Sequence, residues 1–298
     1  MPNLESLLTQ SEELPSLPEI YIKVSDLLES EDSSSQDIGL AVQTDPSLTA
    51  RILKLINSAY YGMPRQVTSV AQAVSLLGRA QLQQILLGTV LAGVFNDMQL
   101  RNFSMTTFWR HSIKTAIIAR HLAMQNVNII DHEAFFTAGL LHDIGRLVIA
   151  KAMPDELAAV DEQVRNGADV IKMESEVLGL THVDVGSALM LKWDMPTIIT
   201  QCVLNHHRIE HEGEHAIATS IVYLANKLSE KPVVETEKEM QGLLSGIRNW
   251  KDAQNTLDQI LIACQLADQQ WVEVMESLGM VDMEINDEEE NPWEGPLF

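Results

Sequence analysis

The sequence has few of the residues that would indicate a secreted or membrane-spanning protein. Only two cysteines occur in 298 residues, Cys202 and Cys264, so we do not expect a disulfide framework, and a reducing cytoplasm is the expected location. The N-terminal stretch is acidic and lacks the basic and then apolar order of a signal peptide. The longest apolar stretch, residues 85–95, is too short to cross a bilayer, so no membrane association is expected.

Aromatic and basic residues are also scarce. Aromatic residues make up 5% of the chain, and long stretches are rich in Leu, Ile, Ala and Gln, a composition that favours helix over sheet. Lys and Arg number 20 against 42 Asp and Glu, which gives a net charge of -22. Such a chain repels phosphate backbones, so we expect no nucleic-acid partner. A local basic pocket for one small phosphate-containing ligand stays compatible with this charge.

Helix signals recur along the chain. Asp45 and Pro46 have the form of an N-cap followed by proline at the first helical position. Ser69 caps a second predicted helix, which Gly78 ends. The apolar residues after Asp45 fall on one helical face, namely Leu48, Ile52, Leu55 and Ile56. No alternating strand pattern of useful length competes, so an all-α fold is predicted.

Three further helices are expected, over residues 108–124, 134–152 and 255–278. The last has an apolar face, which we expect to pack inward, although it would also support a dimer. That face comprises Leu257, Ile260, Leu261, Cys264, Trp271 and Met275. Residues 281–298 carry seven acidic residues and no basic one, which predicts a disordered, solubilising tail. Alternatively the tail is a docking peptide anchored by Trp293, Leu297 and Phe298.

A set of histidines with one aspartate is the strongest chemical signal. It comprises His111, His142, Asp143, His182, His206 and His207, to which the polar Asn226 is added. Imidazole and carboxylate are ligands of Fe, Mn, Zn and Mg ions, and an adjacent His-Asp pair can serve one site. An ion held there would lower the pKa of bound water and polarise a phosphoryl oxygen. Arg146, one turn after His142, could hold a phosphate through its planar fork.

Each of these residues also has an ordinary structural interpretation. His111 alone would be a helix-surface histidine, and His142 with Asp143 would be a hydrogen-bonded pair. Of the neighbours His206 and His207, one could be a ligand while the other interacts with a helix C-terminus. Spacing alone leaves these alternatives open, because ligands scattered over a hundred residues have no local signature.

The motifs around these residues resemble a known family. WRHS, GLLHDIGRL and NHH look like the HD superfamily of metal-dependent phosphohydrolases. TDPSLTARILKLINSAYYG, VTSVAQAVSLLG and THVDVGSALMLKWDMP look like the HDOD domain, the HD-related output domain. The resemblance covers residues 14–228 and implies a two-lobed helical bundle used in bacterial signal transduction. It divides the chain into an N-terminal lobe (1–106), an HD-like lobe (107–232), C-terminal helices (233–280) and the tail.

The resemblance also assigns ligands. The superfamily binds metal through a histidine, the His-Asp doublet and a later aspartate, which match His111, His142 and Asp143. The last position falls at Asn226, a neutral and weaker ligand than carboxylate, so a weak or absent metal is implied. Arg146 stands where related cyclic-dinucleotide phosphodiesterases have lysine, and their GYP motif is missing after the second histidine of NHH.

Three hypotheses follow. In the first, the chain is a regulatory signalling module with a degenerate metal and phosphate pocket, acting on a protein partner, which its acidic surface predicts to be basic. In the second, it is an active metal-dependent phosphohydrolase, with His182, His206 or His207 completing a second metal position and Arg146 clamping the phosphate. In the third, it is a scaffold whose histidines are satisfied core groups.

Overall fold

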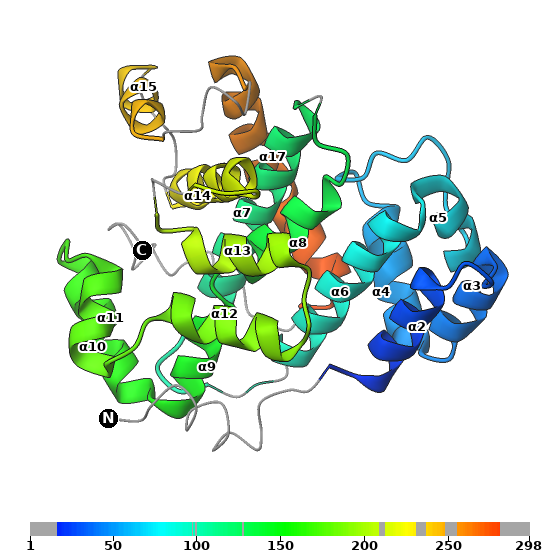
Figure 1. Ribbon diagram of the computed structural model, residues 1–298, viewed down its shortest axis with the longest axis horizontal. Coiled ribbons are helices and arrows are strands. Elements are labelled where there is room, and N and C mark those ends of the chain that lie inside the picture. Colours follow the sequence, from blue (N-terminus) through cyan, green and yellow to red (C-terminus); the bar gives the residue numbers. More distant parts are fainter. Residues whose placement is uncertain are drawn as a thin grey trace.

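Every regular element in the described part of the chain is an α-helix, so the predicted all-α fold is confirmed (Figure 1). The computed structural model describes residues 17–96, 98, 100–126, 128–208, 212–230, 237–247 and 255–280. The first helices are α2 (Glu19–Glu29), α3 (Ser35–Gln43), α4 (Pro46–Ile56), α5 (Val70–Leu77) and α6 (Arg79–Asn96). They are followed by α7 (Met105–Met124), α8 (Glu133–Leu141), α9 (Ile144–Ala152), α10 (Pro154–Arg165) and α11 (Val170–Leu178). The remaining helices are α12 (His182–Lys192), α13 (Thr197–Asn205), α14 (Ala216–Ser229), α15 (Glu237–Ser245) and α17 (Leu257–Ser277).

Helices α2 to α5 form the N-terminal lobe, at the right of Figure 1, and the caps predicted for α4 and α5 are confirmed. The Asp45 carboxylate accepts a hydrogen bond from the backbone N–H of Leu48 at 2.9 Å and starts α4. The Ser69 hydroxyl accepts one from the N–H of Gln72 at 3.2 Å and starts α5. Gly78 has φ +87°, the left-handed region that glycine tolerates, and ends α5. The four apolar residues predicted to share a face of α4 are all buried.

Helix α7 is the centre of the second lobe and packs against α8, α14 and α17 (Figure 1). Most of its residues are buried, as expected for a helix surrounded by three others. Helix α12 packs against α9 and α13, and α13 packs against α8. Helix α6 contacts α2 on one side and α8 on the other, so it joins the two lobes.

The segment predicted as one helix over residues 134–152 is two helices, so that prediction was wrong. Helix α8 ends at Leu141 and α9 begins at Ile144, with His142 and Asp143 between them. Asp143 has φ -99° and ψ 10°, the sparsely populated bridge region, and its carbonyl accepts from the N–H of Arg146 at 2.8 Å. In a continuous helix two adjacent side chains would diverge by about 100°. The break between α8 and α9 lets the side chains of His142 and Asp143 point in the same direction.

A hydrogen-bonded contact joins the lobes at the NSAYYG segment. The Tyr61 hydroxyl donates to Glu133 Oε2 on α8 at 2.7 Å, and Arg120 Nε on α7 donates to Glu133 Oε1 at 2.5 Å. The Arg120 guanidinium lies 4.8 Å from the ring centres of both Tyr60 and Tyr61. Asn57 holds the base of the segment, since its side chain bonds the N–H and the carbonyl of Val67.

The C-terminal helix α17 packs against α7 and also against α4. Its predicted inward face is wrong at Leu261, which is 42% exposed, whereas Ile260 and Met275 are buried. The domain limits at 106 and 232 remain predictions, and the tail at 281–298 lies outside the described residues. Within the described residues, we find no helix that is both long and apolar enough to cross a membrane.

Candidate metal centre

Six of the predicted site residues meet in the second lobe. His111 comes from α7, His142 and Asp143 from the break between α8 and α9, His182 from the start of α12, and the neighbours His206 and His207 from the end of α13. Five of them are buried and His207 is half-buried. Their donor atoms form two groups within which all donor atoms lie within 4.8 Å of one another. Asp143 belongs to both groups.

The Asp143 carboxylate lies between the two groups of rings. Its Oδ2 is 3.3 Å from His142 Nε2 and 3.5 Å from His111 Nε2. Its Oδ1 is 3.2 Å from His206 Nε2 and 3.3 Å from His182 Nε2. His207 Nε2 joins the second group at 3.1 Å from His182 Nε2. One carboxylate with an oxygen on each group is the arrangement of a bridging ligand between two cation positions.

Close helix contacts at glycines bring the ligands together. A Cβ on Gly139 of α8 would lie 2.7 Å from Ala116 Cα of α7, so only glycine lets these helices approach at this point. Gly139 lies three residues before His142, and Ala116 lies five residues after His111. Gly145 of α9 lies against the backbone carbonyl of His182 in the same way. Because Gly139 and Gly145 have no side chain, the segments that carry the candidate ligands can approach one another this closely.

Hydrogen bonds on the far side of the rings fix their tautomers. Nδ1 of His142 bonds the carbonyl of Gly139 at 2.7 Å, and Nδ1 of His206 bonds the carbonyl of Val203 at 2.7 Å. A carbonyl only accepts, so both Nδ1 atoms carry hydrogen and both Nε2 lone pairs face the centre.

His111 is oriented in the same way, with Nε2 toward the centre, by a hydrogen bond between its Nδ1 and a hydroxyl group. The Ser229 hydroxyl donates to the carbonyl of Asn226 at 2.7 Å and lies 3.0 Å from His111 Nδ1. Because a hydroxyl has one proton, Nδ1 of His111 donates to Ser229. The result is a set of lone pairs around a carboxylate, with Nε2 atoms only 3.1 Å apart between His111 and His142. Such a set could hold a cation.

A series of charged side chains lies on the side of the His182 ring that faces away from the centre. Nδ1 of His182 donates to Glu174 Oε2 on α11 at 2.7 Å, and Glu174 Oε1 accepts from Arg146 at 3.3 Å. Arg146 is buried and also bonds Asp161 on α10. The predicted phosphate contact by Arg146 finds no support in this geometry, because both terminal nitrogens face carboxylates inside the protein. A carboxylate behind a ligating histidine is the usual outer partner in metal sites.

The pKa directions follow from burial and from these contacts. Burial opposes the charge on His182, but Glu174 and Asp143 outweigh it and raise its pKa to about 9. Burial lowers the pKa of His206 to about 4, and it holds the pKa values of His111 and His207 well below their usual range. Burial also opposes the charge on Asp143, yet the surrounding histidines hold its pKa well below the usual range. The metal-free centre therefore carries positive charge on His182.

Buried polar atoms without a hydrogen-bond partner indicate whether these residues fit a metal ion. Asp143 Oδ2 is buried without a hydrogen-bond partner among the described residues. Asn226 on α14 is fully buried, and neither its Oδ1 nor its Nδ2 has a partner there. A buried polar atom without a partner is costly, and a cation held by His111, His142 and Asp143 would satisfy Asp143 Oδ2. The five imidazoles and the carboxylate also match Fe, Mn or Zn better than Mg, so the donor set fits a transition metal.

Sequence reasoning identified the six residues that meet here but misjudged some of their surroundings. His206 and His207 both point to the centre, with ring centres 4.4 Å apart, rather than in different directions. Glu174 was missed, although it interrupts an apolar stripe of α11 between the buried Val170 and Leu178. An acidic residue at i+4 of such a stripe is a signal for a buried partner.

Comparisons with known proteins agree with this fold. The model of the HDOD domain matches residues 14–209. A candidate phosphohydrolase from Shewanella amazonensis SB2B is 25% identical with a TM-score of 0.72, over 92% of this chain and 97% of that one. A candidate signal transduction protein from Marinobacter aquaeolei VT8 is 24% identical with a TM-score of 0.69, over 92% of this chain and 61% of that one. An uncharacterised protein of Treponema pallidum (strain Nichols) is 25% identical over 210 residues, which is 70% of this chain and 40% of the length of that relative.

Proposed function

The chain belongs to the HDOD domain family, and we propose that it is a regulatory module of signal transduction whose buried centre binds a divalent metal without hydrolysing a phosphoester. The observation that carries this proposal is the place of Arg146. Its guanidinium lies behind the centre, bonded to Glu174 and Asp161, and is not available as a clamp for a phosphate. Five of the six ligand residues are also buried, which restricts the entry of a substrate.

In this proposal the ligands act as a connection between helices. They come from α7, the break between α8 and α9, α12 and α13, so one or two bound ions would tie these segments together. A divalent ion there would supply positive charge between the two groups of lone pairs and a Lewis acid for any bound oxyanion. Gain or loss of the ion would then change how firmly the helices pack, which is a difference that a partner protein can read.

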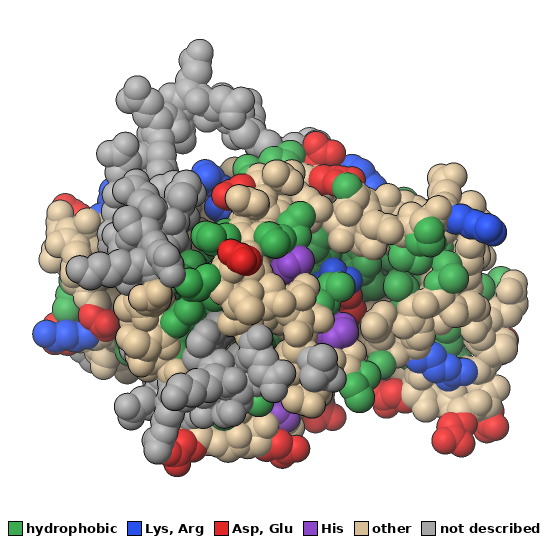
Figure 2. All heavy atoms as spheres, turned by 90° about the horizontal axis from the view of Figure 1, so that it is seen from above, with side chains coloured by type: hydrophobic (Ala, Val, Ile, Leu, Met, Phe, Trp, Pro, Cys, Tyr) green, Lys and Arg blue, Asp and Glu red, His purple; other side chains and the backbone are tan. Residues whose placement is uncertain are grey.

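A protein partner is part of the proposal, and the N-terminal lobe offers a surface for it. Leu40 on α3 and Leu76 on α5 are 55% and 56% exposed, and these two helices pack against each other. Figure 2 shows apolar side chains gathered over that lobe, at the right of the view. Exposed apolar side chains are typical of interaction surfaces.

An active metal-dependent phosphohydrolase is the second candidate, and one observation favours it. The second group of ligands is complete without Asn226, since Asp143, His182, His206 and His207 supply four donors. Lys227 is close enough to contribute to the low pKa values of His111 and His207, so an amino group is near the centre. Its Nζ pairs with Glu230 at 2.9 Å, so it would have to leave that carboxylate to serve the phosphate in place of Arg146.

Metal content and turnover distinguish the two candidates. Protein purified without chelator would be subjected to elemental analysis and assayed with bis(p-nitrophenyl) phosphate, beside Asn226→Asp. The regulatory proposal expects metal in the parent without turnover, and tighter binding in Asn226→Asp because a carboxylate adds charge to the first group. Asn166→Asp adds the same charge at the exposed residue that follows α10 and should leave metal binding unchanged. Metal-dependent turnover by the parent protein would reject the regulatory proposal in favour of the hydrolase.

A further inference from the structure

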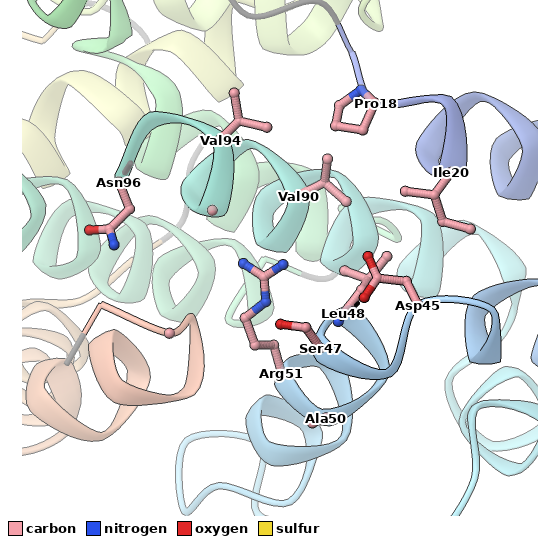
Figure 3. Close-up of a pocket in the computed structure, with 12 residues that line it drawn as sticks. Pro18, Ile20, Asp45, Ser47, Leu48, Ala50, Arg51, Val90, Val94 and Asn96 are labelled. Atoms are coloured by element: carbon pink, nitrogen blue, oxygen red, sulfur yellow. Dashed lines mark hydrogen bonds between the residues drawn. The ribbon is translucent and has the colours of Figure 1, made fainter. Parts of the chain in front are cut away.

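A cavity of about 480 Å³ lies in the N-terminal lobe, between α4, α6 and the residues that follow α17 (Figure 3). Its apolar wall is made by Pro18, Ile20, Leu48, Val90 and Val94. None of the metal-centre residues lines it. This volume is in the range of cavities that take small organic ligands.

Arg51 of α4 points into this cavity toward α6, as Figure 3 shows. Two glycines make room for it. A Cβ on Gly93 of α6 would collide with Nη1 of Arg51, so the guanidinium lies directly on the helix backbone. Gly279, with φ +84°, approaches the aliphatic part of Arg51, and a Cβ there would be 2.9 Å from its Cδ. The position of this side chain is therefore built into the fold.

The Arg51 guanidinium nevertheless makes no hydrogen bond or ion pair with the described residues, and its buried Nε has no partner. By contrast, Arg79 donates to the carbonyl of Ser30 at 2.6 Å, and Arg120 pairs with Glu133. Asp45 lines the cavity, but its carboxylate accepts from the backbone at the start of α4. A guanidinium has five N–H donors, and leaving the buried Nε–H of Arg51 without an acceptor costs free energy.

At the other polar end of the cavity a donor is missing instead. Asn96 of α6 lines the cavity, and its Oδ1 is buried without a partner among the described residues. The cavity thus presents a fixed cation, an amide with unused hydrogen-bonding capacity and an apolar wall. Planar guanidinium groups favour carboxylate and phosphate, which accept two parallel N–H bonds.

We propose that this cavity binds a small organic acid, with its carboxylate or phosphate on Arg51 and its apolar body against Leu48, Val90 and Val94. The nearby Asp45 carboxylate favours a ligand with one anionic head over one with several. The site is separate from the metal centre and does not depend on the function proposed for that centre.

Methyl NMR of the full chain, labelled at Leu and Val, tests the proposal with hexanoate and hexyl phosphate as probes. Hexan-1-ol, which has the same apolar body without the charge, is the control probe. We expect at least one acid to shift the Val90 and Val94 methyl signals in a saturable manner, at least tenfold more tightly than the alcohol. Which acid binds more tightly identifies the head group. Absence of saturable shifts with both acids would overturn the proposal.

Two variants assign the binding to Arg51. Arg51→Gln should weaken the binding of the acid at least tenfold and leave the weak binding of the alcohol unchanged. Lys54→Gln removes the same charge from the next turn of α4, at an exposed side chain that pairs with Glu276, and should bind like the parent. Equal binding of acid to the parent and to Arg51→Gln, with both proteins folded by circular dichroism, would also refute the site.

Discussion

Glu174 accepts two hydrogen bonds from His182, at 2.7 Å from the ring Nδ1 and at 2.8 Å from the backbone N–H. Both residues are fully buried. The same carboxyl also bonds Arg146, so its position is fixed from two sides. Glu174 therefore orients the ring of His182, holds its Nδ1 proton and increases the basicity of the nitrogen that faces Asp143.

Above pH 9, where the ring of His182 is unprotonated in the parent as well, Glu174→Gln should weaken metal binding by about 10–100-fold, because an amide holds the His182 ring less firmly and adds no charge behind it. Competition of Zn²⁺ between the protein and a chelating dye measures the change. Glu176→Gln, two residues along α11 at an exposed side chain paired with Lys172, is the matched control. Equal affinities for both variants and the parent would show that Glu174 does not support a metal ligand.

The two tyrosines of NSAYYG should differ in their contribution to stability. Tyr61→Phe removes the hydroxyl that donates to Glu133 and should lower the free energy of unfolding by about 1–2 kcal/mol. Tyr60→Phe should change it by less than about 0.5 kcal/mol, since the Tyr60 hydroxyl is buried without a hydrogen-bond partner among the described residues. Urea unfolding of both variants measures the difference. The reverse order would mean that Tyr61 does not join the lobes as described.

Gly139→Ala should separate α8 from α7, because the added methyl meets the Ala116 backbone. Overpacking of this kind costs about 1–3 kcal/mol, and here it also moves His142 relative to His111. We expect a lower melting temperature and weaker Zn²⁺ binding. Gly242→Ala is the control, since a Cβ at that position of α15 has open space, and it should be neutral or stabilising by up to about 1 kcal/mol. Unchanged metal binding in Gly139→Ala would contradict the role of this contact.

Local signals predicted the helices well where a cap and an apolar face coincide. For α4, Asp45, Pro46 and the apolar spacing all agree with the structure, because these features act within one or two turns. The break at His142 and Asp143 was missed for a physical reason. Residues 134–152 contain no proline, and their single glycines are compatible with helix. The break is stabilised by tertiary contacts of the two polar side chains, which no local pattern records.

The candidate ligands were predicted from their residue types, the resemblance assigned His111, His142 and Asp143 among them, and the structure brings these three residues together. What the sequence could not provide is the direction of long side chains. Arg146 lies one turn after His142 and was expected to reach a phosphate, whereas it turns to Asp161 and Glu174 from two other helices. Such partners come from other helices, so the packing of α9 and α11 against α10 determines them.

Metal binding should release about one proton at pH 7.5. Glu174 and Asp143 raise the pKa of His182 to about 9, so its ring is protonated before the ion binds, whereas a ligand nitrogen must be unprotonated. His111, His206 and His207 have lowered pKa values, are neutral at this pH and release none. Affinity should therefore rise about tenfold for each pH unit between 7 and 9 and then level off.

Calorimetric titration of Zn²⁺ in buffers of different ionisation enthalpy counts the protons released. In Glu174→Gln the main charge that raises the pKa of His182 is lost and burial then favours the neutral ring, so the release should fall toward zero. The Glu176→Gln control should release as many protons as the parent. If the parent releases none, His182 is neutral before binding, and the positive charge assigned to the metal-free centre is refuted.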